Sequence, residues 1–278
     1  IFFYDGRDVL MPSVFSREGV KVKDIQLPPV FASHYDASLI KRAVLAVQST
    51  RVQPFGNKPG AGRMNTAEYI GVRGKPTEHR TINVAKARLP RLRNKRGILY
   101  GKVASVPQAV GGPRAHPPKV ETRTEERINI KERKKAIASA IGASVNAKIV
   151  KARGHVFDEK MFPLIVDASF ENTTKTREIM HALKALHVEK DVENAKNSKR
   201  TRAGKNKNRG KRFRMKKSLL IVTDGTKPVY KAGRNLPGVE VVQVQSLNAE
   251  HLAPGALAGR LTIWTESAVN MLAKKGGH

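Results

Sequence analysis

The side chains with the clearest chemical use are cations, which gather in two stretches without Asp or Glu. The first covers residues 79–120 and the second covers residues 195–223. Lys and Arg bind phosphate oxygens, and Arg adds forked hydrogen bonds and stacking on bases. Without counter-charges such segments repel themselves, so the pattern predicts binding to a polyanion.

The two basic stretches differ in composition. The first interleaves its cations with Leu89, Leu92 and Tyr100 and with several Gly and Pro, which is typical of a segment that takes a specific shape against RNA. In the second, the cations near Lys205 stand among Asn and Gly, so solvated disorder or a nuclear-targeting patch stays an open alternative there. The cations of the first are Arg80, Lys86, Arg88, Arg91, Arg93, Lys95, Arg96, Lys102, Arg114 and Lys119. Those of the second are Lys196, Lys199, Arg200, Arg202, Lys205, Lys207, Arg209, Lys211, Arg212, Arg214, Lys216 and Lys217.

Overall composition favours nucleic acid as the partner. The 278-residue chain has 53 Lys and Arg against 23 Asp and Glu, a formal charge of +30 and a pI near 10.7. No apolar run approaches the roughly eighteen residues of a spanning helix, and the basic stretches lack an apolar face for a bilayer, so we expect no membrane partner. The absence of Cys excludes disulfides and thiolate zinc sites and fits an intracellular protein, and the first residues do not resemble a signal peptide.

Motifs for catalysis are missing. Residues 204–212 approach a phosphate-binding loop, but five residues separate Gly204 from Gly210 where the motif has four, and Arg212 stands where it has a hydroxyl. The turn at Asp224 and Gly225 offers a single glycine, and the eight His residues show no metal-ligand spacing. We therefore predict no enzymatic activity, no cofactor and no metal.

Periodicity divides the chain into a folded part and an insertion. Asp36 is expected to cap a helix over residues 37–48, and a helical pattern returns near Lys131 with small residues suited to close packing. Between them periodicity vanishes, and Gly and Pro interrupt any regular element. We expect a globular domain of residues 1–49 and 127–278, an inserted RNA-penetrating loop of residues 50–126, and a basic RNA-binding segment of residues 195–217 within the globular part.

The C-terminal half alternates strand and helix patterns. Short, continuous apolar runs predict strands at residues 163–168, 218–223, 239–244 and 261–264, as in a parallel sheet covered on both faces. Helices are expected at residues 175–186, capped by Thr173 or Thr174 and buried through Ile179, Leu183 and Leu186, and at residues 266–274. The fold class predicted is α/β, a Rossmann-like layered globular domain with a long irregular basic loop insertion.

An ordered set of short segments resembles one known family. They include RLPRLR at residues 88–93, VPQAVGG at 106–112, RAHPPK at 114–119, RAGK at 202–205 and GRLTIWTESA at 259–268, with further matches at 27–31, 51–55, 130–136, 153–155, 234–238 and 252–255. Together these segments resemble the universal large-subunit ribosomal protein L-four family in its archaeal and eukaryotic branch, and RAHPP is closer to the archaeal form.

The resemblance implies a structural constituent of the large subunit of the cytoplasmic ribosome. It implies binding to large-subunit ribosomal RNA, neighbouring large-subunit proteins, and a loop that reaches the wall of the polypeptide exit tunnel and meets the nascent polypeptide. A free-standing RNA-binding or ribosome-assembly factor is the alternative. The side chains expected to contact RNA are Arg51, Arg63, Arg73, Arg80, Arg88, Arg91, Arg93, Lys95, Arg96, Lys102, Arg114, His116, Lys119, Arg200, Arg202, Lys205, Lys207, Arg209, Lys211, Arg212, Arg214 and Arg234.

Overall fold

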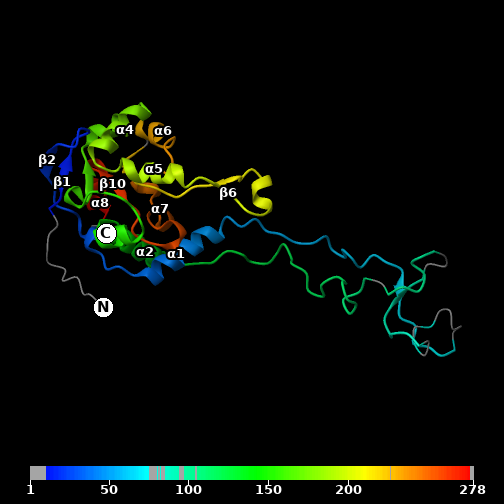
Figure 1. Cartoon of the computed structure of the whole chain (residues 1–278). Coiled ribbons are helices and arrows are strands. Elements are labelled where there is room, and N and C mark those ends of the chain that lie inside the picture. The colour runs from blue at the N-terminus through cyan, green and yellow to red at the C-terminus, as the bar shows by residue number, and fades with distance from the viewer. Residues whose placement is uncertain are drawn as a thin grey trace. The chain divides into compact units, whose positions relative to one another are not determined.

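The computed structural model describes residues 11–74, 80, 82, 85–93, 97–103, 105–225 and 227–275. It divides into two compact units, Ile1–Thr50 with Glu126–His278, here called the body, and Arg51–Glu125, here called the long loop (Figure 1). Within the body, the Glu126 amide donates a hydrogen bond of 2.9 Å to Ser49 Oγ. The residues between which the long loop is inserted are therefore neighbours in space.

A six-stranded sheet of order β2-β1-β5-β10-β8-β9 forms the centre of the body. Its strands are β1 (Ser13–Phe15), β2 (Lys21–Asp24), β5 (Leu164–Val166), β8 (Leu220–Thr223), β9 (Glu240–Gln243) and β10 (Thr262–Thr265). The pairings of β1 with β5, β5 with β10, β10 with β8 and β8 with β9 are parallel, and β2 adds an antiparallel edge. The predicted α/β class with a parallel sheet is confirmed.

Helices cover both faces of this sheet. Because side chains alternate along a strand, Ile165, Trp264 and Val222 enter one core cluster, and Val166, Ile263 and Ile221 enter a second. The first cluster includes residues of α1 (Ala37–Ser49), α2 (Ile130–Val145), α7 (Ala249–Leu252) and α8 (Glu266–Lys275). The second includes residues of α3 (Ala147–Ala152), α4 (Thr176–Ala185), α5 (Glu189–Asn197) and α6 (Val229–Gly233). The body is thus a three-layer structure.

Short 3₁₀ turns complete the body. They are η1 (Pro29–Ala32), η3 (Glu159–Met161), η4 (Ala168–Asn172), η5 (Lys205–Asn208), η6 (Val244–Ser246) and η7 (Pro254–Ala256). Asp36 caps α1 as predicted, because its carboxylate accepts from the amides of Ser38 and Leu39. The predicted threonine cap of α4 is wrong, since Lys175 occupies that position without a side-chain bond and Thr173 Oγ1 instead donates to Phe170 O. The buried stripe of Ile179, Leu183 and Leu186 is confirmed.

The long loop contains more regular structure than its sequence predicts. Strands β3 (Ala67–Glu68) and β4 (Arg91–Leu92) pair in antiparallel register, and Arg91 forms a further bridge with Val103. Before and after them the chain runs as two limbs held by backbone-directed bonds, such as Asn57 N to Pro118 O at 3.3 Å and Arg63 Nη2 to Ala115 O at 3.1 Å. Ile70 is buried, so the described residues between 67 and 103 form a small folded tip.

Candidate nucleic-acid interface

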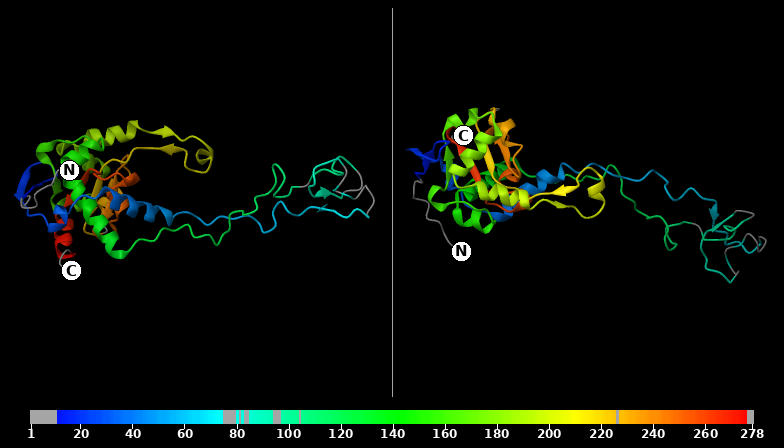
Figure 2. Two further views of the ribbon diagram at one scale, coloured as in Figure 1. Left: turned by 90° about the horizontal axis from the view of Figure 1, so that it is seen from below. Right: turned by 45° about the horizontal axis from the view of Figure 1, so that its top comes forward.

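Residues 199–217, here called the basic ribbon, form an antiparallel hairpin between α5 and β8 (Figure 2). Strands β6 (Arg200–Thr201) and β7 (Phe213–Arg214) are its sides, and η5 lies at its turn. The sequence predicts a basic segment from residue 195, but residues 195–197 belong to the last turn of α5, where Ala195 is wholly buried. The basic run is therefore an ordered hairpin in the part of the chain described here.

One face of the basic ribbon carries four arginines. Arg200 lies opposite Arg214 in the strand register, and the hydrogen bond from Arg202 N to Arg212 O extends that register by one pair. Directly opposed residues share a face of a ribbon, so the four arginine side chains leave the backbone on one face, here called the arginine face. The Arg212 guanidinium then reaches toward the Phe213 ring, with its Cζ 5.4 Å from the ring centroid. Like charges in opposed positions destabilise a hairpin. A chain of phosphates along this face would remove that repulsion.

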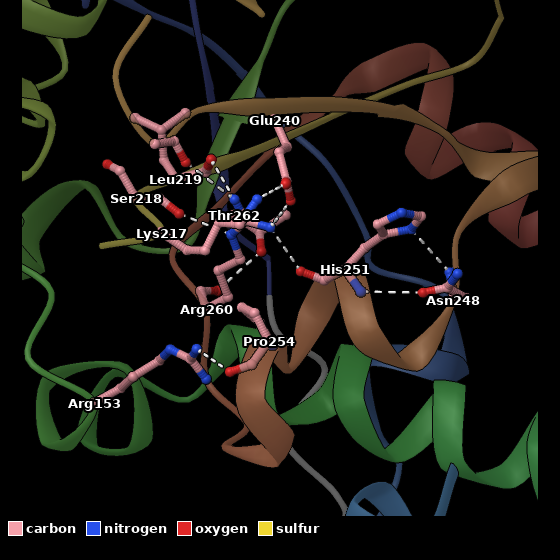
Figure 3. Close-up of polar contacts among 11 residues, drawn as sticks. Arg153, Lys217, Ser218, Leu219, Glu240, Asn248, His251, Pro254, Arg260 and Thr262 are labelled. Atoms are coloured by element: carbon pink, nitrogen blue, oxygen red, sulfur yellow. Dashed lines mark hydrogen bonds and ion pairs between the residues drawn. The ribbon is translucent and has the colours of Figure 1, made fainter. Parts of the chain in front are cut away.

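The root of the ribbon is held by a buried arginine, shown in Figure 3. Arg260 is wholly buried, and its Nε donates to Ser218 O at 2.7 Å. Its remaining donors reach Glu240 Oε2 at 2.6 Å and the carbonyl oxygens of His251, Leu219 and Gly238 at 2.9, 3.2 and 3.3 Å. The guanidinium thereby joins the residues just before β8 and β10 to β9 and α7, next to the end of the ribbon at Lys217.

Glu240 extends this network to the surface. Its second carboxylate oxygen accepts from Lys217 Nζ, at the end of the ribbon. Partial burial would raise the pKa of Glu240, but the charges and hydrogen bonds of Arg260 and Lys217 outweigh this and hold it below its ordinary value. Gly238 permits the close approach, because it has φ +74° and a Cβ there would lie 2.7 Å from Lys216 O.

A second buried network holds Ser218, the residue after Lys217. Ser218 Oγ donates to Asp191 Oδ2 at 2.5 Å, and His155 Nδ1 lies 3.1 Å from both oxygens of that carboxylate. Burial would raise the pKa of Asp191, but the His155 and Ser218 bonds outweigh it and the pKa lies below its ordinary value. The three residue types match a hydrolase triad, yet the hydroxyl bonds the carboxylate and not the imidazole, so no base activates it. This network is structural.

Two further arginines of the body differ in their exposure. Arg153, which sequence analysis did not assign to RNA, donates to Pro254 O at 2.7 Å and Ala258 O at 3.4 Å. Burial lowers its pKa to about 10, and the charge of Arg260 acts in the same direction. Arg234, a predicted RNA contact, is exposed and its Cζ lies 5.8 Å from the centroid of the Tyr230 ring. Arg153 is thus a structural residue, whereas Arg234 remains accessible.

The long loop presents most of its predicted cations to the surface. Arg91 differs, because it is half-buried and donates to Gly101 O at 3.0 Å and Ala87 O at 2.9 Å, so it holds the tip together. Arg93 is exposed but forms an ion pair with Glu68, and Arg80 is half-buried. Lys95 and Arg96 lie outside the described residues. The exposed candidates are Arg51, Arg63, Arg73, Arg88, Arg93, Lys102, Arg114, His116 and Lys119.

The carboxyl ends of the parallel strands, where α/β enzymes bind nucleotides, are occupied by an internal network. The buried Glu171 accepts from Thr265 Oγ1 at 2.7 Å and from the Asp224 amide at 3.2 Å. Within residues 11–275, excluding the gaps stated above, there is no cluster of potential metal ligands. None of the helices that the structure describes is long and apolar enough to cross a membrane.

Known proteins resemble the chain along nearly its whole length. The family model described as "Ribosomal protein L4/L1 family" matches residues 25–275. A protein of Methanoregula boonei named "Large ribosomal subunit protein uL4" is 48% identical over 252 residues, 91% of this chain and 94% of its own. Proteins of the same name from Methanocaldococcus jannaschii and Methanoculleus marisnigri are 45% and 49% identical, over 94% and 90% of this chain and 98% and 93% of their own.

Proposed function

The chain belongs to the ribosomal protein L4/L1 family, and on this premise we propose how its basic surfaces act in a ribosomal particle. It is a structural constituent of the large subunit of the cytoplasmic ribosome, it binds large-subunit ribosomal RNA, and it is not an enzyme. The arginine face of the basic ribbon is the observation that carries the mechanism. Four arginine side chains that leave the backbone on one face, in a segment without acids, match a run of backbone phosphates.

The body and the basic ribbon bind RNA by neutralising phosphates and releasing counterions. The buried networks around Arg260 and Asp191 hold the ribbon in one orientation, so little entropy is lost when RNA docks on it. The exposed cations of the long loop add contacts with RNA. Other large-subunit proteins are further partners of the chain, in line with its family.

The tip of the long loop contributes to the wall of the polypeptide exit tunnel and meets the nascent polypeptide. The support is its length and surface: Arg51–Glu125 is an insertion whose tip exposes Ile98, Leu99 and Tyr100 beside its cations. A photo-crosslinker at Ile98, in ribosomes carrying a stalled nascent chain, tests this. Labelling of the nascent chain or of tunnel RNA is expected, and labelling of solvent-side proteins alone would refute it.

We propose a separate role for each part of the chain. Residues 1–49 and 127–278 act as a globular anchor, residues 50–126 as an RNA-penetrating insertion, and the basic segment within residues 195–217 as a second RNA contact. We infer that the anchor is Rossmann-like in general build, since a parallel sheet lies between two helical layers. Its strand order, with β10 between β5 and β8, departs from the usual dinucleotide-binding order.

A free-standing RNA-binding or assembly factor would share the same surfaces, and sedimentation separates the two functions. A permanent constituent stays with the large subunit in gradients at high salt, because many of its contacts are enclosed by RNA. A transient factor dissociates, since its binding is mainly electrostatic and screened by salt. We expect the chain to co-sediment with the large subunit at a salt concentration that strips known assembly factors.

A further inference from the structure

The basic ribbon has a second face with different chemistry. Thr201 lies opposite Phe213 in the register, so both side chains point away from the arginine face, and Met215 follows Phe213 on the same side of the chain. Phe213 is 48% exposed and Met215 is 42% exposed. Neither residue belongs to either core cluster of the body. Their exposure is therefore not required by the packing of the fold.

The Phe213 ring is surrounded by cations. Lys199 Nζ lies 4.5 Å from the ring centroid, and the Arg212 guanidinium carbon lies 5.4 Å from it. These distances are typical of cation–π contacts, which orient the ring and leave its remaining surface open. An aromatic ring flanked by Lys and Arg is the arrangement with which proteins stack unpaired bases while binding the adjoining phosphates.

We propose that Phe213 is a stacking site for an unpaired nucleobase of the bound RNA, with Met215 and Thr201 extending the platform and Lys199 and Arg212 binding its phosphates. The inference rests on the RNA-binding function proposed above and adds a site that the charges do not reveal. Charge complementarity favours a nucleotide over an apolar protein surface, because eleven Lys and Arg residues and no acid occupy residues 199–217. The arginine face would then bind the backbone phosphates of an RNA strand, and Phe213 would stack on a base of the same strand.

Phe213→Leu in the full-length chain separates stacking from charge, since it keeps an apolar side chain and every cation. The probes are a single-stranded oligoadenylate of about twelve nucleotides and an abasic strand with the same number of phosphates, at one fixed salt concentration. We expect the variant to bind oligoadenylate about tenfold more weakly and the abasic strand as the wild type does. Tyr35→Leu, at an exposed aromatic of the body outside the ribbon, is the matched control and should change neither affinity.

Phe213→Trp supplies a second readout. Trp264, the single tryptophan of the chain, is buried away from added RNA, so a change in emission that the wild type does not show reports on the ribbon. Stacking predicts quenching by oligoadenylate and none by the abasic strand. Equal oligoadenylate affinity of wild type and Phe213→Leu would overturn the stacking site alone, whereas absence of binding to either strand would overturn the RNA-binding function as well. A blue shift without quenching on addition of oligoadenylate to the isolated chain would mean that the ring becomes buried without stacking on a base, and would also overturn the proposal.

Discussion

Arg260 and Glu240 form a charge pair of 2.6 Å in which the guanidinium is wholly buried and the carboxylate is partly exposed. The other carboxylate oxygen, Glu240 Oε1, accepts from Lys217 Nζ. Arg260 Nε donates to the carbonyl oxygen of Ser218, the residue after Lys217. Two consecutive residues at the end of the basic ribbon are thus fixed from inside the body. The basic ribbon, which carries opposed like charges, is therefore held by buried hydrogen bonds where it joins the body.

Replacing Arg260 by Met should destabilise the body by about 3–5 kcal/mol, because it removes the buried partner of Glu240 and the Arg260 bonds to four carbonyl oxygens. Of these four carbonyls, those of Leu219 and Gly238 keep a backbone amide donor. Urea unfolding of the full-length chain near neutral pH measures this. Lys217→Met is the control, since Lys217 is half-exposed and its pair with Glu240 contributes at most about 1 kcal/mol. Equal unfolding free energies for the two variants would contradict a central role of Arg260.

Asp191 makes the free energy of unfolding of the body depend on pH. Its pKa in the folded chain lies below the ordinary 3.8, so the carboxylate contributes stability that is present above that value and is lost as the pH falls through the folded pKa. Asp191→Asn should cost about 1–3 kcal/mol at pH 7 and flatten the loss of stability below about pH 4. Glu193→Gln, at an exposed position of the same helix, should stay within about 0.5 kcal/mol of the wild type. Parallel curves for Asp191→Asn and wild type would refute the coupling.

Much of the body follows from local sequence pattern. Strands β5, β8 and β10 are continuous apolar runs because both faces of a parallel sheet are buried, and that signal is readable. Strand β2 was not predicted, because all four of its residues are exposed at a sheet edge and give no apolar pattern. Helix α5 escaped because only Val192 and Ala195 give it an apolar side, while its buried Asp191 looks like a surface residue.

The charge pattern predicted which segments form the candidate site, but it could not predict how their side chains are arranged. A count of Lys and Arg finds the basic ribbon but cannot give the strand register that places Arg200, Arg202, Arg212 and Arg214 on one face. The same count overlooks Phe213, although an aromatic residue inside a basic run was an available signal. In the long loop, charge alone could not reveal that Arg91 and Arg93 have partners within the tip.

The arginine face should dominate the salt dependence of RNA binding by the body. Changing Arg200, Arg202, Arg212 and Arg214 to Gln removes up to four phosphate contacts, so the log–log slope of affinity against salt should become shallower by about 3–4. Unfolding free energy should not fall, because opposed like charges are removed. The control changes Lys175, Arg177, Lys184 and Lys190, exposed cations of the α4–α5 region, to Gln. Equal slope changes in both variants would show that binding is diffuse.

The body should fold without the long loop. Joining residues 50 and 126 by a short Gly-Ser linker is feasible because the Glu126 amide already bonds Ser49 Oγ at 2.9 Å. A shorter connection costs less closure entropy, so the free energy of unfolding should be unchanged or rise by up to about 2 kcal/mol. Calorimetry should give one cooperative transition. A broad or absent transition would mean that the long loop is part of the folding unit.

Arg91 should matter for the shape of the tip and Arg88 should not. The Arg91 guanidinium joins Gly101 O and Ala87 O, next to the hydrogen bond from Leu92 N to Lys102 O. Losing two such bonds at about 1 kcal/mol each should speed amide exchange at Leu92 by about tenfold or more in Arg91→Ala. Arg88 is exposed on the same tip, so Arg88→Ala removes an equal charge and should leave this exchange rate unchanged. If both variants exchange at the same rate, the bonds of Arg91 do not order the tip, and Arg91 must be counted among the cations available to RNA.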